Sequence, residues 1–122
     1  MKPASLFLTE ESLGINADLY ELTMALAYFE AGCTTDRATF EVFAPKLSTK
    51  RNFYVAAGLE QVFHFLKCFK FGNESIEYLK RLPVFQTASD SFFEYLRHFE
   101  FTGDVYAMPE GTVFFAKEQK SY

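Results

Sequence analysis

Residues 18–30, Asp-Leu-Tyr-Glu-Leu-Thr-Met-Ala-Leu-Ala-Tyr-Phe-Glu, carry the clearest structural signal in the chain. The apolar positions that recur at the three-to-four spacing of one helix face are Leu19, Leu22, Leu26 and Phe29. Gly32 follows where a helix commonly ends. We therefore expect a helix here, with Asn16 as its N-cap and with Asp18 and Glu21 placing negative charge at the positive end of the helix dipole.

Three more helices are expected downstream. The second carries apolar residues at helical spacing, namely Leu59, Val62, Phe63 and Leu66. The third begins at the Asn73 cap and stops at Pro83, because proline disfavours helical geometry in the residue before it. The fourth begins at Ser91, where the run Ser91-Phe92-Phe93-Glu94 has the form of a capping box.

Alternating segments separate and follow these helices. Residues 38–43 alternate well enough to predict a strand that Pro45 ends. Residues 53–56 form a short apolar run that predicts a strand or a turn leading into the second helix. Alternation after Phe99, broken at residues 109–111, predicts two or three antiparallel strands. The fold class is therefore α+β, with helices packed on a small, mostly antiparallel sheet that combines the Thr39 strand with the strands after Phe99.

Length and composition predict one domain over residues 1–122. Aromatic residues make up 19% of the chain, with 16 Phe, 7 Tyr and no Trp, so we expect some rings to need a partner that covers them. Residues 116–122 follow an apolar strand without any element that would close the sheet edge. The pattern predicts a truncated domain.

Charge and cysteine usage exclude several classes of function. The net charge of −4 argues against a nucleic-acid partner. Cys33 and Cys68 are too few for a disulfide framework and show no zinc-finger spacing, so two reduced, mostly buried thiols are expected. No run approaches the roughly 18 apolar residues of a membrane helix, and acidic residues interrupt any signal-peptide core. A cytoplasmic protein without a membrane partner is expected.

No common catalytic motif is present, since the phosphate-loop, dinucleotide, zinc-protease and serine-hydrolase signatures are all missing. His64 and His98 are interpreted as helix residues rather than as a catalytic or metal-binding pair. The residues therefore suggest no catalytic group and no metal ligand in this chain.

Two groups of side chains could bind a ligand. Asp18 and Tyr20 project from the first turn of the first helix, where ligands often bind. From the residues alone, a charged helix start and an ordinary core residue are the more usual explanation of this pair. A basic group in the loop after the first strand could contact a phosphate or could simply be solvated. Its members are Lys46, Lys50 and Arg51.

Four segments in the same order resemble the nicotinate phosphoribosyltransferase family. They are residues 18–25 (Asp-Leu-Tyr-Glu-Leu-Thr-Met-Ala), 38–43 (Ala-Thr-Phe-Glu-Val-Phe), 51–61 (Arg-Asn-Phe-Tyr-Val-Ala-Ala-Gly-Leu-Glu-Gln) and 99–113 (Phe-Glu-Phe-Thr-Gly-Asp-Val-Tyr-Ala-Met-Pro-Glu-Gly-Thr-Val). The resemblance covers about residues 18–115 and only the N-terminal domain of the family. It implies that an α/β barrel follows this domain in a complete enzyme. Because a domain built to pack on a barrel keeps that face when the barrel is missing, we expect an exposed apolar patch that includes aromatic side chains.

The resemblance also implies an activity. The family joins nicotinate to phosphoribosyl pyrophosphate, with ATP and magnesium, to give nicotinate mononucleotide for NAD biosynthesis, and is classed with the ligases. It implies that Tyr20 stacks on the pyridine ring with Asp18 beside it, both reaching into the barrel of an adjacent subunit, so a homodimer or other self-association is expected. Lys46 is the retained member of a basic pair that contacts substrate.

What the chain lacks limits this expectation. The family's phosphorylated histidine belongs to the barrel, and neither His64 nor His98 matches it. We therefore expect the 122-residue chain alone to bind no cofactor and to be inactive. Two alternatives stay open, namely a non-catalytic domain that docks on a full-length relative and a related transferase that acts on nicotinamide.

Overall fold

The computed structural model describes residues 10–44 and 50–116. The chain divides into two compact units. Unit 1 comprises Met1–Asp36 and His64–Thr102, and unit 2 comprises Arg37–Phe63 and Gly103–Tyr122. Within the described ranges, no helix has the length and apolar character needed to cross a membrane. Because the two units are separate bodies, each is considered by itself.

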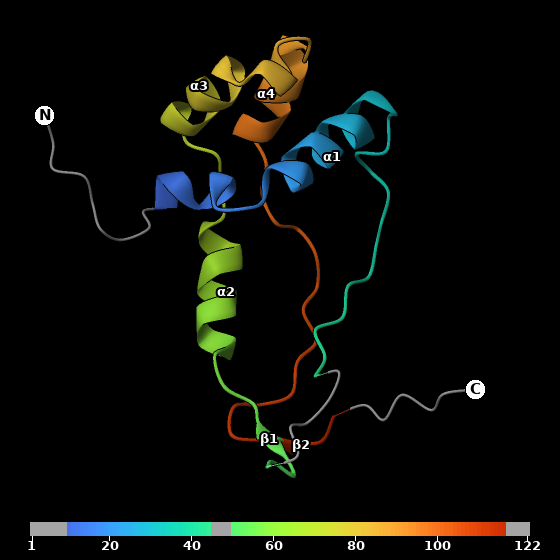
Figure 1. Cartoon of the computed structure of the whole chain (residues 1–122), viewed down its shortest axis with the longest axis vertical. Helices are drawn as coiled ribbons and strands as arrows, with labels where there is room; N and C mark the ends of the chain where they lie inside the picture. The colour runs from blue at the N-terminus through green and yellow to red at the C-terminus, as the bar shows by residue number, and fades with distance from the viewer. Residues whose placement is uncertain (1–9, 45–49, 117–122) are drawn as a thin grey trace, which may run out of the picture. The chain divides into compact units, whose positions relative to one another are not determined.

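Unit 1 is helical. Its elements are η1 (Glu10–Ile15), α1 (Leu19–Glu30), α3 (Asn73–Arg81), η2 (Pro83–Phe85) and α4 (Asp90–Arg97), together with the end of α2 (Leu59–Cys68). Figure 1 shows α1, α3 and α4 gathered together, and α3 contacts η1, η2 and α4. The four helices expected from the spacing of apolar residues are therefore confirmed.

The core of unit 1 is built from leucine, isoleucine and phenylalanine side chains. Its most deeply buried members are Phe85, Phe92, Ile76 and Leu79. Phe92 meets Phe29 edge to face, with ring centroids 5.5 Å apart, and stacks on Phe85 at 6.2 Å. Leu22 and Leu26 bring α1 into the same cluster. Burial of these rings and branched chains is the main force that stabilises unit 1.

The N-cap of α3 differs from the expected one. Gly72, with an extended backbone, occupies the N-cap position, and Asn73 is the first helical residue. The Asn73 side chain instead accepts a hydrogen bond from the Arg97 guanidinium of α4. The amide that was expected to cap α3 thus links the two helices, and the expectation that Asn73 is the cap is wrong.

The cap of α4 is also shifted. Ser89, not Ser91, is the N-cap, and its hydroxyl oxygen accepts the Phe92 N–H at 3.3 Å. The two serine hydroxyls lie 2.8 Å apart. A capping serine must have extended backbone and lie three residues before the amide it binds, and only Ser89 meets both conditions.

Unit 2 contains a small antiparallel sheet. Strand β1 (Tyr54–Val55) pairs with β2 (Val113–Phe114), so that Tyr54 faces Phe114 and their rings stack at 5.5 Å. Backbone bonds of 2.9 Å beyond the strands, from Gly111 N–H to Ala56 and from Ala56 N–H to Thr112, extend the pairing. The described residues thus combine helices with a small antiparallel sheet, which is the expected α+β class.

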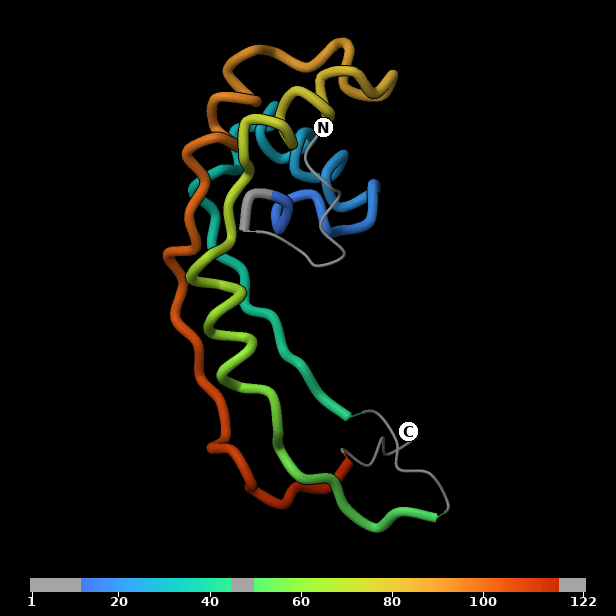
Figure 2. Tube along the Cα trace, turned by 90° about the vertical axis from the view of Figure 1, so that its left-hand side faces the viewer, coloured from blue at the N-terminus to red at the C-terminus, as the bar shows by residue number. Residues whose placement is uncertain are grey.

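The expected sheet is wrong in its membership. Residues 38–43 are extended but belong to no strand, and Figure 2 shows the trace through residues 37–44 running without coiling. The Phe40 side chain is 91% exposed. Residues 100–108 are likewise outside any strand. Alternation in sequence favours extended backbone, whereas a strand also requires a hydrogen-bonded neighbour, and no backbone bond between described residues involves residues 38–43.

A carboxylate from a distant part of the chain fixes the beginning of α2. Glu110 Oε1 accepts the N–H groups of Gly58 at 2.8 Å and Leu59 at 2.7 Å. The Gly58 amide immediately precedes α2, and the Leu59 amide opens its first turn, where backbone N–H groups have no helical acceptor. Gly58 has a φ of 100°, a conformation that favours glycine. Glu110 therefore acts as a long-range cap within unit 2.

Candidate functional site

The beginning of α1 is held by a capping box. Asp18 is the N-cap, with φ of −68° and ψ of 143°, and forms the box with Glu21. The Asp18 N–H donates to Glu21 Oε2 at 3.2 Å. The expected cap, Asn16, lies two residues earlier and is exposed. Asn16 is therefore not the cap, because the chain enters helical geometry only after Asp18.

Tyr20 lies on the solvent side of the first turn of α1. Its side chain is 60% exposed, and its carbonyl accepts the Thr23 hydroxyl at 2.9 Å. At 100° per residue, Tyr20 lies opposite Leu22 and Leu26, which are buried in the core. The alternative that Tyr20 is an ordinary core residue is therefore wrong in this structure, and the ring is open to a ligand or partner.

Two further large side chains continue this exposed surface. Met24 and Tyr28 follow Tyr20 at intervals of four residues and are 44% and 54% exposed. We call these three residues the α1 outer face. It is an exposed apolar surface that contains aromatic side chains. The spacing was readable from the sequence, but which face of α1 would be buried was not.

The basic residues are placed unequally. Lys46 lies outside the described residues, so its position stays a prediction. Lys50 and Arg51 are exposed in unit 2. Of the three residues predicted to bind substrate, the structure brings together Asp18 and Tyr20, two residues apart at the start of one helix.

The comparisons with known proteins cover the part of the chain that contains α1 and the sheet. The family model of the nicotinate phosphoribosyltransferase N-terminal domain matches residues 15–120. The chain belongs to the nicotinate phosphoribosyltransferase family. Its segments at the start of α1 and around Glu110 thus fall inside the matched domain.

Several curated relatives support this membership. Nicotinate phosphoribosyltransferase pncB2 of Mycobacterium tuberculosis (strain ATCC 25618 / H37Rv) is 46% identical over 101 residues, covering 83% of this chain and 21% of its own length. Nicotinate phosphoribosyltransferase 2 of Arabidopsis thaliana is 38% identical, over 82% of this chain and 18% of its own length. Nicotinate phosphoribosyltransferase of Bos taurus is 38% identical, over 80% of this chain and 18% of its own length. The chain therefore spans about a fifth of the length of these relatives. No solved structure matches the chain.

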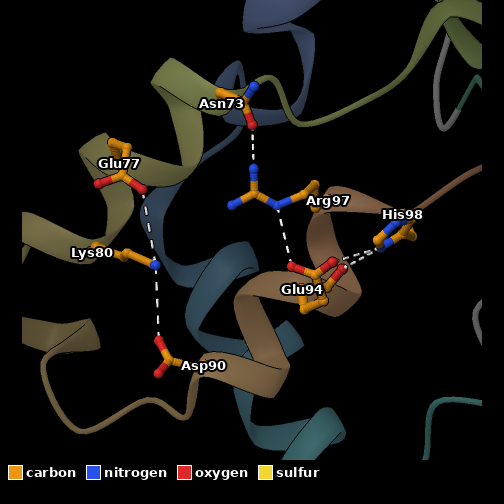
Figure 3. Close-up of polar contacts among 7 residues, drawn as sticks. All are labelled: Asn73, Glu77, Lys80, Asp90, Glu94, Arg97 and His98. Carbon is orange, nitrogen blue, oxygen red and sulfur yellow. Dashed lines mark hydrogen bonds and ion pairs between the residues drawn. The ribbon is translucent and has the colours of Figure 1, made fainter.

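The nicotinate phosphoribosyltransferase domain also carries a polar network on α3 and α4 (Figure 3). Arg97 Nε lies 3.3 Å from Glu94 Oε2, and His98 Nδ1 lies 3.4 Å from Glu94 Oε1. Lys80 lies 3.9 Å from Glu77 and 3.8 Å from Asp90. The carboxylate of each pair is exposed, so each pair contributes little to stability. The pair with Glu94 places His98 at the end of α4 as an ordinary helix residue, as the sequence predicts.

The two thiols have different surroundings. Both are free and half-buried, which is less buried than expected. A hydrogen bond with Asp36 raises the pKa of the Cys33 thiol, with smaller contributions from desolvation and from the Asp36 charge. Cys68 lies beside His64, four residues earlier on α2. The sequence prediction overlooked this pair because it considered only the spacings of known zinc motifs.

Proposed function

We propose that this chain forms the nicotinate-facing wall of a nicotinate phosphoribosyltransferase that acts in NAD biosynthesis. In this proposal, the Tyr20 ring stacks on the pyridine ring and Asp18 lies beside it. The observation that carries the proposal is the exposed Tyr20 ring on the first turn of α1, within the matched family domain. An aromatic ring presented on a helix whose other face is buried is a suitable stacking platform.

The reaction mainly requires positioning and electrostatic stabilisation. Pyrophosphate leaves the ribose carbon of phosphoribosyl pyrophosphate while the pyridine nitrogen is held in line. Leu22 and Leu26 fix α1 to the core of unit 1, so the Tyr20 ring projects from a helix that is held in place. A stacked ring limits the orientations of nicotinate before the reaction, which is the contribution that we assign to this chain.

The charges near Tyr20 limit what this wall can do. Asp18 and Glu21 are both acidic, and their capping box already occupies amides at the start of α1. The nicotinate carboxylate therefore needs cations from elsewhere in the assembled site. We assign phosphate contact to Lys46, and the remaining phosphate donors to the barrel of an adjacent subunit in a homodimer.

ATP and magnesium belong to the proposal for the complete enzyme. Magnesium would neutralise charge on the pyrophosphate as it leaves. Within residues 10–44 and 50–116, no group of three or more His, Cys, Asp or Glu side chains could hold a metal ion. We therefore assign no residue of this chain to magnesium, and we propose that the 122-residue chain alone forms no nicotinate mononucleotide.

Replacing the proposed stacking ring tests this function. In a full-length relative, changing the residue equivalent to Tyr20 to alanine should weaken nicotinate binding by about 1–3 kcal/mol, the value of an aromatic stack on a base. Calorimetric titration with nicotinate measures the effect. The matched control is Tyr28→Ala, which removes an exposed tyrosine from the same helix two turns later. Equal affinities of the Tyr20→Ala variant and the parent would refute the stacking role.

A docking domain is the second candidate function. The observation that favours it is the α1 outer face, whose large apolar side chains are exposed in this chain. A non-catalytic domain could use this face to bind a full-length relative. Sedimentation of the chain mixed with such a relative should then show a complex, which Met24→Asp weakens. Separate sedimentation of the two proteins at micromolar concentrations would exclude this candidate.

A further inference from the structure

Helix α2 places an imidazole and a thiol on one face. His64 and Cys68 are four residues apart, so their side chains are neighbours on the helix surface. Cys68 Sγ lies 3.8 Å from Nδ1 and 3.9 Å from Nε2 of His64. His64 is exposed and Cys68 is half-buried, so a small ion from solvent can reach both.

The separation of these atoms suits a transition metal. A tetrahedral zinc ion with bonds of about 2.3 Å to sulfur and about 2.0–2.1 Å to nitrogen holds those two atoms about 3.6 Å apart. The distance from Cys68 Sγ to His64 Nδ1 is 3.8 Å. Because Cys68 Sγ lies almost equally far from both ring nitrogens, the imidazole must also turn about its side-chain torsions to aim one nitrogen at the ion.

We propose that His64 and Cys68 form a two-ligand site for zinc or a similar divalent transition metal. The thiol releases its proton to solvent and binds as thiolate, the neutral imidazole binds through one nitrogen, and water fills the remaining positions. Sulfur and nitrogen ligands favour zinc and cobalt over magnesium and calcium, which prefer oxygen. The bound ion links two successive turns and thereby stabilises α2.

This site is independent of the proposed nicotinate site, since it uses neither Asp18 nor Tyr20. The chain offers a matched control for each ligand. Cys33 is a second half-buried thiol, which interacts with Asp36 rather than with a histidine. His98 is a second exposed histidine, which pairs with Glu94. Neither control has the imidazole and thiol together.

Cobalt binding to the reduced full chain is the direct test. Binding of Co²⁺ to a thiolate produces a charge-transfer absorption in the near ultraviolet, and zinc should displace it. The absorption should appear in the parent protein and in Cys33→Ser and His98→Gln. It should be lost in Cys68→Ser, and His64→Gln should weaken cobalt binding by about 10-fold or more, because even groups behind metal ligands contribute 10–100-fold to affinity.

Circular dichroism of each variant before metal addition shows whether α2 is still folded. Zinc should raise the thermal midpoint of the parent protein and leave that of Cys68→Ser unchanged, because a metal stabilises only the state that binds it. Persistence of the cobalt absorption in Cys68→Ser would overturn the proposal. Unchanged cobalt affinity in His64→Gln would also overturn it, because the thiol would then bind without the imidazole.

Discussion

Units 1 and 2 of this chain use aromatic residues in opposite ways. In unit 1, phenylalanines contact one another in a buried cluster, and Phe92 is 0% exposed. In unit 2, Phe40, Phe43 and Phe115 are exposed, and the two-residue strands β1 and β2 form the only sheet among the described residues. The same composition therefore builds a buried cluster in unit 1, which also carries the exposed α1 outer face, and leaves these rings of unit 2 exposed.

Phenylalanine truncation in each unit should show the largest difference. Phe92→Ala removes a ring that contacts Phe29, Phe85 and Phe93, so it should lower the free energy of unfolding by about 3–5 kcal/mol. Phe40→Ala removes an exposed ring and should change it by less than about 0.5 kcal/mol. Urea unfolding of both variants measures the difference. Similar losses for the two would mean that Phe40 is buried in solution.

The long-range cap of α2 should have an intermediate effect. Glu110→Ala leaves the N–H groups of Gly58 and Leu59 without their acceptor, so it should destabilise the protein by about 0.5–2 kcal/mol. Asp104→Ala is the control, because it removes an exposed carboxylate from the same unit. Thermal unfolding followed at the helical circular dichroism signal compares them. A control variant as unstable as Glu110→Ala would argue against the cap.

The two serines at the start of α4 should differ by the least. Ser89→Ala removes the oxygen that accepts the Phe92 N–H and should cost about 1 kcal/mol of unfolding free energy. Ser91→Ala removes only a hydroxyl contact with Ser89 and should lower the unfolding free energy by only about a few tenths of 1 kcal/mol. Urea midpoints of the two variants check the order. The reverse order would restore Ser91 as the cap.

The sequence predicted the helices better than the sheet. Helical spacing reports a local preference, so α1 to α4 could be recognised from residues within single turns. Strand pairing depends on distant segments, which is why residues 38–43 were wrongly expected in a sheet while Tyr54 was not identified as a sheet partner. The cap connects Glu110 with Gly58 and Leu59, which lie 52 and 51 positions earlier in the chain. No local pattern could therefore reveal it.

For the candidate site, the family resemblance predicted more about the roles of single residues than the chemistry of those residues did. The residues alone left Tyr20 divided between core and ligand roles, and only the structure shows the ring exposed on α1. The pairing of His64 with Cys68 required only helical spacing, although it matches no known motif. The contribution of Lys46 could not be tested, because it lies outside the described residues.

Amide hydrogen exchange tests most directly the claim that unit 1 has a buried core whereas residues 38–43 of unit 2 are exposed. Peptides from α3 and α4 should exchange slowly, because their amides open only when the buried core opens. Peptides covering residues 38–43 should exchange at nearly unprotected rates in this chain, and the equivalent peptides of a full-length relative should be protected. Strong protection of residues 38–43 in the isolated chain, at the level of α4, would contradict the account.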